Sequence, residues 1–315
     1  MDMPPEKTPR YFTLNSHFIR VFGRRAQKIP LDAGFSCPNR DGSLSSRGCS
    51  FCNERGSGSG LARTGLDLAD QWELWRGRYA ENRAAAPAYI AYLQSFSNTY
   101  GPVKKLTAVL ESLVALPGIA GFSIGTRPDC LDEDKIALLT AVPLPERWIE
   151  LGVQSAHDET LRRVNRGHDA ACSERAITAC AAANLNVCAH LILGLPGENR
   201  KHMLASVAWL NSLPVSGVKL HNLFVCEQTP LAALWRSGSY TLLEEHAYLD
   251  LVLDCLTRLR PDIAIHRLVS DTSSERLVAP AWAAMHYRML QRVNSELARR
   301  NLWQGKELGL EFTLP

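Results

Sequence analysis

The strongest constraint on the fold is an alternation of strand-like and helix-like runs, which begins near residue 28 and continues for almost two hundred residues. Short apolar runs separated by amphipathic runs indicate parallel strands joined by helical crossovers. Six such strands fit either an open doubly wound sheet or an incomplete (β/α) barrel. We expect strands at 29–35, 89–94, 121–124, 148–153, 187–193 and 217–223, with helices at 66–81, 102–116, 132–141, 157–166, 172–184 and 199–212.

Polar loops follow the ends of these expected strands. In both folds, ligands bind at the carboxyl ends of parallel strands, so the side chains of these loops should converge on one mouth. The loops are a cysteine-rich segment after the first strand, then Ser95–Thr99, Thr126–Asp129, Gln154–Ser155 and Gly194–Glu198.

The cysteine loop carries the pattern Cys37-x11-Cys49-x2-Cys52. Cys49 and Cys52 are close enough in sequence for one turn to aim both thiolates at a metal centre, and the Asp41-Gly42 pair lets the chain double back with Cys37. Three thiolates leave one metal position open for a small molecule, which favours an iron-sulfur site. The alternatives are a zinc loop completed by a distant residue such as His17, or a surface loop with incidental thiols.

Composition sets wider bounds. With 315 residues and 46% hydrophobic content, the chain can bury a large core in one α/β domain with an appendage. The net charge of +3 is too mild to demand a polyanionic partner. The sequence shows neither a signal peptide nor a membrane-length apolar run, so we expect a cytoplasmic protein with no membrane partner. Cys180, Cys188 and Cys255 lie among apolar residues and should be small buried side chains.

Two terminal segments differ from the alternating part. Residues 1–27 form a basic and aromatic extension, in which the helical spacing of Phe18 and Phe22 favours an amphipathic helix packed on the barrel. The alternative is an RNA-facing surface, on which the basic side chains neutralise phosphates. The residues that would do so are Arg20, Arg24 and Arg25, with Lys28 just beyond the extension.

The segment 240–315 reads as a C-terminal extension. It should contain a helix at 241–259, an apolar strand at 263–269 and a helix at 280–300. The strand can add to the barrel edge and bring His266, Arg267 and Asp271 to the mouth; a solvated connection is the alternative.

Several motifs in order resemble the radical S-adenosylmethionine enzymes, and within them the group related to the catalytic subunit of elongator and its bacterial relatives. Phe51 stands just before the last cysteine, as in that superfamily, although the first cysteine spacing is longer than its usual three residues. The longer spacing is typical of the narrower group. The resemblance covers about residues 28–225, through the cysteine loop and the runs 126–129, 150–155, 164–168 and 194–197.

The resemblance implies a partial, TIM-like (β/α)6 barrel over residues 28–239 and a mainly helical C-terminal extension. The barrel would hold a [4Fe-4S] cluster on Cys37, Cys49 and Cys52, with the methionine part of S-adenosylmethionine on the open iron. One electron from an external flavodoxin or ferredoxin type of reductant would cleave the sulfonium to a 5'-deoxyadenosyl radical, which abstracts hydrogen from the substrate.

The resemblance also implies roles for single residues. Phe51 should lie beside the adenine, Gln94 and Ser95 should face the methionine ammonium, and Gln154 the ribose hydroxyls or carboxylate. Arg166 should reach the carboxylate, and Gly194 and Gly197 should let the backbone approach the adenine. Phe51 as a core residue and Arg166 as a partner of a helix dipole are the alternatives. His190 stands where some relatives have an acid.

Kinship with elongator-type proteins points to a modified nucleoside in transfer RNA, such as the side chain of a wobble uridine. A small metabolite or a protein side chain is the alternative substrate. A non-catalytic zinc or iron-sulfur protein is the alternative of a different class, but it leaves Gln154, Arg166 and the Gly194–Gly197 turn unexplained.

Overall fold

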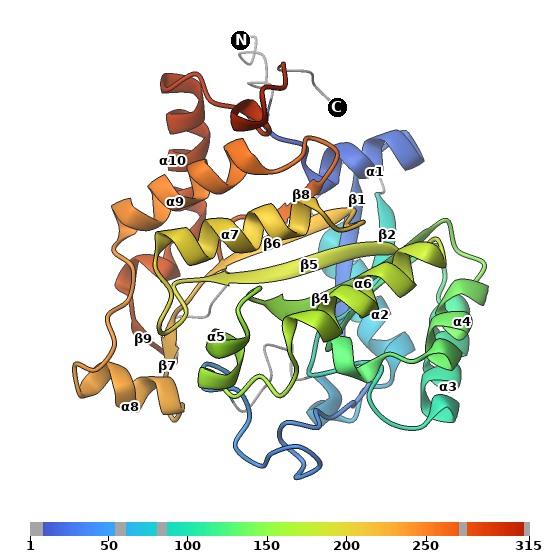
Figure 1. Ribbon diagram of the computed structural model, residues 1–315. Helices are drawn as coiled ribbons and strands as arrows, with labels where there is room; N and C mark the ends of the chain where they lie inside the picture. The colour runs from blue at the N-terminus through green and yellow to red at the C-terminus, as the bar shows by residue number, and fades with distance from the viewer. Residues whose placement is uncertain (1–8, 54–60, 81–86, 271–275, 312–315) are drawn as a thin grey trace.

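Seven parallel strands form one curled sheet in the computed structural model, which describes residues 9–53, 61–80, 87–270 and 276–311 (Figure 1). Neighbouring strands follow the order β1-β2-β3-β4-β5-β6-β8. A doubly wound sheet reverses its strand order, whereas a barrel adds each strand beside the last, so the fold is the partial barrel. The strands are β1 Ala26–Leu31, β2 Ala88–Leu93, β3 Ile119–Thr126, β4 Glu146–Gln154, β5 Asn186–Leu193, β6 Gly217–Asn222 and β8 Ala264–Arg267.

The apolar strand expected at 263–269 is confirmed as β8, and it adds a seventh strand at the edge of the sheet by pairing with β6. Ala264 and Ile265 are buried there, so burial of an apolar run extends the sheet. The free edge of β8 meets the N-terminal segment: Ile265 N donates to Phe12 O at 2.7 Å. Helix α1, Leu14–Phe22, contacts both β1 and β8, so the N-terminal segment spans the opening between the two edge strands.

Helices cover the outer face of the sheet in Figure 1. In α3, for example, Leu106, Leu110 and Leu113 recur at helical spacing and are buried. Side-chain caps start several of these helices, such as Asp169 on α6. The remaining helices of the described chain are α2 Leu68–Ala80, α3 Val103–Val114, α4 Glu133–Ala141, α5 Asp158–Arg163, α6 Ala170–Ala182, α7 Arg200–Asn211, α8 Pro230–Arg236, α9 Glu245–Arg258 and α10 His286–Arg299.

The C-terminal region is more divided than the sequence analysis expected. Helix α8, which was not foreseen, begins after the Thr229 cap with a proline in its first turn. Strands β7 Val225–Cys226 and β9 Leu277–Ala279 form a small antiparallel pair. The helix expected at 280–300 is a short 3-10 turn, Ala281–Ala284, followed by α10.

Helix α1 lies at the end of the barrel opposite the cysteine loop: α1 is at the top of Figure 1, and the blue loop near residue 45 is at the bottom. Phe18 is buried, as the amphipathic interpretation predicted. Arg20, Arg24 and Arg25 are exposed, but they lie on or beside α1, away from the loop. None of the helices within the described ranges has the length and apolar character needed to cross a bilayer.

Candidate active site

A cavity of about 210 Å³ opens at the carboxyl ends of the strands and holds all three cysteines of the loop. Its volume is an order of magnitude above what one water needs, so it suits a ligand. Four of the predicted cofactor-binding residues, those other than glycine and serine, line it with the thiols. The lining includes Cys37, Cys49, Phe51, Cys52, Gln94, Arg127, Gln154, Arg166, His190, Lys219, His221, Asn222 and Arg267.

The cysteine loop folds by backbone turns at the expected places. The amides of Arg40 and Asp41 donate to Cys37 O at 2.9 and 3.2 Å, and Gly42 has the positive φ of 94° that favours glycine. Cys52 N donates to Cys49 O at 3.1 Å, which closes the second turn. The loop therefore delivers three free thiols to one cavity.

The surroundings of the thiols fit a four-iron cluster. Asn39 Nδ2 and Arg166 Nη1 lie 3.4 and 3.6 Å from Cys49 Sγ, where they can donate to an anionic sulfur. Burial, with a smaller contribution from Cys49, raises the pKa of the Cys52 thiol to about 11, so this thiol would release a proton when it binds iron. Among the described residues no three His, Cys, Asp or Glu groups stand close enough to share one metal ion. A four-iron cube does not require such closeness, because its corners hold the thiolates apart.

His17, the distant ligand of the zinc alternative, lies elsewhere. Its Nε2 is 2.9 Å from Glu146 Oε2, at the start of β4. The cysteines lie at the opposite, carboxyl end of the sheet. That placement overturns His17 as a fourth ligand of the loop.

The segment after α5 clamps the cysteine loop. Ser50 N donates to Val164 O at 3.0 Å, and Asn165 Nδ2 donates to Gly48 O at 2.7 Å. Asn165 adopts a left-handed φ of 54°, which explains why α5 ends at Arg163 and not at the expected residue 166. The run 164–168 thus positions the loop.

The amino acids predicted to bind S-adenosylmethionine divide into two sets. Gln154 lies at the end of β4 with a φ of 73°, a strained value for a non-glycine residue that often marks a binding site. It lines the cavity with Phe51, Gln94 and Arg166. Arg166 donates through Nε and Nη2 to Gly152 O, at 3.2 and 2.6 Å.

The second set, Ser95, Gly194 and Gly197, does not line the cavity. Ser95 is fully buried, and its hydroxyl has no partner among the described residues. Gly194 accepts a hydrogen bond from Tyr240, and a Cβ on Gly197 would meet Arg163 at 2.2 Å. In the structure, both glycines therefore face neighbouring side chains.

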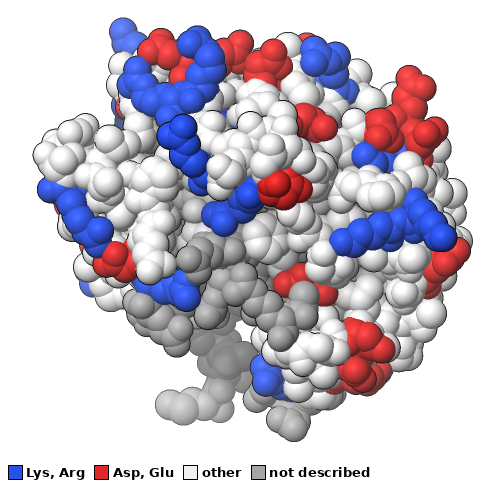
Figure 2. Space-filling view, turned by 90° about the horizontal axis from the view of Figure 1, so that it is seen from below, with Lys and Arg blue, Asp and Glu red and all other residues white. Residues whose placement is uncertain are grey.

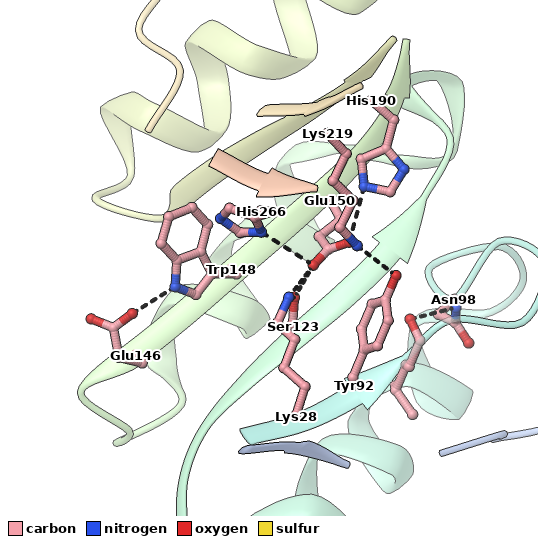
Figure 3. A network of polar contacts seen from close by, with 11 residues as sticks. Lys28, Tyr92, Asn98, Ser123, Glu146, Trp148, Glu150, His190, Lys219 and His266 are labelled. Carbon is pink, nitrogen blue, oxygen red and sulfur yellow. Dashed lines mark hydrogen bonds and ion pairs between the residues drawn. The ribbon is translucent and has the colours of Figure 1, made fainter. Parts of the chain in front are cut away.

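A buried polar network fills the barrel next to the cavity (Figure 3). Glu150, with no exposed side-chain surface, pairs with both Lys28 and Lys219. Ser123 Oγ donates to Glu150 at 2.5 Å, and His190 Nε2 lies 2.9 Å from it. Lys219 also donates to Tyr92 Oη at 2.8 Å.

This network sets the charges inside the barrel. Burial alone would raise the pKa of Glu150, but Lys219 and Lys28 outweigh it and hold that pKa well below its usual range. Burial and Lys219 lower the pKa of His190 to about 4, and burial lowers that of His266 to about 3. At neutral pH Glu150 is therefore an ionised carboxylate, and the imidazoles of His190 and His266 are neutral.

Sequence analysis did not single out Glu150 or Lys219, although each is a lone charge in an otherwise apolar strand. A charge in such a strand must find a partner inside the barrel. The alternative in which Lys28 neutralises RNA phosphates is wrong, because its side chain points inward to Glu150. Arg267 lines the cavity as expected, His266 is buried beside Trp148, and Asp271 lies outside the described residues.

Comparison with known proteins agrees with this geometry. Residues 45–210 match the radical SAM superfamily, and residues 215–299 match the radical SAM C-terminal domain. The first match begins between Cys37 and Cys49, where the unusual spacing lies. The chain is 37% identical to the uncharacterized protein YtqA of Bacillus subtilis, across 94% of this chain and 92% of that one.

More distant likenesses concern elongator-type proteins. The archaeal Methanocaldococcus infernus Elp3 superposes with a TM-score of 0.67 at 15% identity, over 89% of this chain and 64% of that one, which shows a shared fold. The tRNA uridine(34) acetyltransferase of Dehalococcoides mccartyi is 29% identical over 48% of this chain and 33% of its own length.

The family match, the partial barrel and the three-cysteine cavity agree on one assignment. Radical S-adenosylmethionine enzymes use a [4Fe-4S] cluster and S-adenosylmethionine, and the residues that line this cavity fit both. The sequence matches and the shared fold also support the elongator-like group. The chain belongs to the radical S-adenosylmethionine superfamily and is an enzyme of that kind.

Proposed function

We propose that this enzyme modifies a nucleoside of transfer RNA, with the side chain of a wobble uridine as its target. The observation that carries the proposal is the continuity of the cysteine cavity with the polar interior of the barrel. Tyr92, Glu150 and Lys219 line the same cavity as Cys37 and Cys49. A substrate group that enters there would meet hydrogen-bonding side chains beside the cysteines that would hold the cluster.

The bound cofactors supply a 5'-deoxyadenosyl radical that abstracts hydrogen. The chain's own residues would bind and orient the reactants. Cys37, Cys49 and Cys52 would hold the cluster, and Phe51, Gln94 and Gln154 would contact S-adenosylmethionine, as their place on the cavity supports. The electron would come from an external flavodoxin or ferredoxin type of reductant.

The transfer RNA part of the proposal is supported by the relative from Dehalococcoides mccartyi, whose name specifies a tRNA uridine. Figure 2 looks at the molecule from the side of the cysteine loop, where basic side chains appear on several parts of the surface with acidic ones between them. Arg47 on the loop and Arg162 on α5 are exposed. These arginines replace the N-terminal basic residues as candidate phosphate contacts.

The test compares modified nucleosides in transfer RNA from cells with and without the gene, by mass spectrometry of digested RNA. We expect one wobble-uridine derivative to disappear and its precursor to accumulate. Anaerobic turnover of that precursor RNA with dithionite should then give one 5'-deoxyadenosine per product. An unchanged profile would refute the RNA substrate and favour a metabolite or protein substrate.

Binding of the RNA phosphates can be measured separately. Replacing Arg47 and Arg162 with Gln should reduce the slope of log affinity for transfer RNA against log salt by roughly 0.7–0.9 for each phosphate that is no longer neutralised. The triple variant Arg20→Gln, Arg24→Gln, Arg25→Gln is the matched control and should keep the slope. The reverse pattern would place the RNA on the α1 side.

A further inference from the structure

Two buried arginines, Arg127 and Arg166, line the cavity beside the cysteines, and their hydrogen bonds differ. Arg166 uses all three guanidinium nitrogens: Nε and Nη2 donate to Gly152 O, and Nη1 lies 3.6 Å from Cys49 Sγ. Arg127, at the end of β3, has two nitrogens committed. Its Nε and Nη2 donate to the two carboxylate oxygens of Asp129 at 2.8 and 2.7 Å.

The third nitrogen of Arg127 is unsatisfied. Nη1 is buried and has no hydrogen-bond partner among the residues that the structure describes. The side chain is 3% exposed and lines the cavity with Cys37 and Cys49. Burying a cationic donor without an acceptor lowers the stability of the fold. The unsatisfied Nη1 therefore indicates that a bound ligand supplies the acceptor.

Arg127 is also held rigidly. Its backbone amide donates to Ser97 Oγ at 3.1 Å, and that hydroxyl lies 3.1 Å from Thr126 Oγ1. The two-point contact with Asp129 fixes the plane of the guanidinium. Asp129 thus fixes the guanidinium through Nε and Nη2, while Nη1 remains available to another acceptor. A guanidinium held in this way is preorganised for a planar anion, because little side-chain entropy is lost on binding.

We propose that Arg127 Nη1 donates to the carboxylate of S-adenosylmethionine, and that Asp129 positions Arg127 for this contact. The carboxylate is the anionic group of this cofactor. With the methionine part on a cluster held by the cysteines, this carboxylate would lie at the cysteine end of the cavity, where Arg127 lies. Arg166 instead acts on the cysteine loop, through Cys49 Sγ and the carbonyl of Gly152. This assigns to Arg127 the role that sequence resemblance gave to Arg166.

The test uses anaerobic, cluster-loaded protein and two ligands that differ in the amino-acid part. S-adenosylmethionine carries the carboxylate, whereas 5'-methylthioadenosine lacks the aminocarboxypropyl chain and keeps adenine, ribose and the methylated sulfur. Arg127→Gln should weaken S-adenosylmethionine binding about 10- to 100-fold and change 5'-methylthioadenosine binding less than about 3-fold. Arg127→Lys, which keeps the charge but loses the fork, should fall between wild type and Gln. Asp129→Asn should weaken S-adenosylmethionine alone, by a smaller factor.

Arg166→Gln is the matched comparison, since it removes a second buried arginine of the same cavity. It should lower iron content or shift the cluster's reduction potential, with no preference between the two ligands. Equal losses of both ligands in Arg127→Gln, or a loss specific to S-adenosylmethionine in Arg166→Gln but not in Arg127→Gln, would overturn the proposal. If Arg127→Gln does not load a cluster, the losses of affinity for S-adenosylmethionine and for 5'-methylthioadenosine are compared in Arg127→Lys instead.

Discussion

Glu150 of β4 and Lys219 of β6 form an ion pair inside the barrel across the intervening strand β5, and Lys28 from β1 joins the same carboxylate. Three strands that are far apart in sequence are therefore tied together by one side chain. The carboxylate has no exposed surface, so solvent cannot replace either partner. The pair lies against the cavity, which links the stability of the barrel to the site.

The first prediction concerns Glu150→Gln. The change removes the carboxylate that pairs with both Lys28 and Lys219, and breaking a buried ion pair in this way costs about 3–5 kcal/mol. Urea unfolding of the cluster-free protein measures the free energy of unfolding. Glu159→Gln, which removes an exposed partner of Arg163 on α5, is the control and should leave it unchanged. Similar losses in both variants would contradict the central role of Glu150.

The second prediction concerns pH. The pKa of His190 is about 4 and that of His266 about 3 in the folded protein, against about 6.5 in the unfolded chain. Between these values the unfolded chain binds more protons, so stability falls as the pH drops below about 6.5. Each histidine contributes a slope near 1.4 kcal/mol per pH unit. Glu150 contributes no slope here, because its depressed pKa matters only below about pH 4.3.

Urea unfolding of cluster-free protein at pH 7.5, 6.0 and 5.0 measures that slope. His190→Asn should reduce this slope by about 1.4 kcal/mol per pH unit, the contribution of one histidine. His246→Asn, at an exposed position of α9, is the control. The same slope in wild type and His190→Asn would show that this imidazole protonates in the folded state.

Much of the fold could be predicted because each βα unit has its own local signal. The buried run Ala88–Leu93 and the stripe of Leu106, Leu110 and Leu113 show their burial in the sequence. Strand β8 was harder to place in the sheet, since a short apolar run does not indicate by itself that it pairs with β6. Helix α5 ends early for a similar reason: Asn165 turns to bind Gly48, a partner far away in sequence.

The site could be predicted where its chemistry requires a particular residue type. It was less predictable where the direction of a side chain depends on partners from other elements. The spacing of Cys37, Cys49 and Cys52 marks them from the sequence alone. By contrast, the inward direction of Lys28 depends on Glu150, which is contributed by another strand. The clamp between Asn165 and the cysteine loop likewise exists only after α5 has packed. Tertiary pairing of polar groups is thus the main information that local patterns lack.

A third prediction concerns the cysteines. Replacing Cys37, Cys49 or Cys52 with Ala should remove most of the iron after anaerobic reconstitution, because two thiolates hold the cluster poorly. Cys180→Ala is the control: burial raises the pKa of that thiol to about 12, and it lies on the buried face of α6. Iron and sulfide analysis measures the outcome. Equal iron loss in Cys180→Ala would mean that the variants act through folding.

A fourth prediction concerns Gly152→Ala. A Cβ there would meet Arg166 Nη2 at 2.6 Å and Gln154 Nε2 at 2.7 Å, so both side chains must move. S-adenosylmethionine affinity should fall at least about 10-fold, which corresponds to the loss of one or more hydrogen bonds. Gly77→Ala, on the exposed side of α2, meets nothing within 4 Å and should keep the affinity. Unchanged binding in Gly152→Ala would show that neither displaced side chain contacts the ligand.

The last prediction concerns Gln154, whose backbone φ of 73° is unfavourable for any side chain. Gln154→Gly relieves this strain but loses the amide, so stability and binding should change in opposite directions. We expect the free energy of unfolding to rise by up to about 1 kcal/mol, since glycine adopts this conformation without a penalty. Affinity for S-adenosylmethionine should fall by about 1–3 kcal/mol, which is the range for a buried hydrogen bond.

Gln154→Ala separates the two effects, because it loses the amide but keeps the strain. It should bind as weakly as Gln154→Gly while remaining no more stable than wild type. Urea unfolding and anaerobic titration of the cluster-loaded variants measure the two quantities. Wild-type affinity in both variants would show that the strained backbone has no part in binding. Weak binding in both variants, with raised stability only in Gln154→Gly, would show that the strain is retained because the amide must point into the cavity.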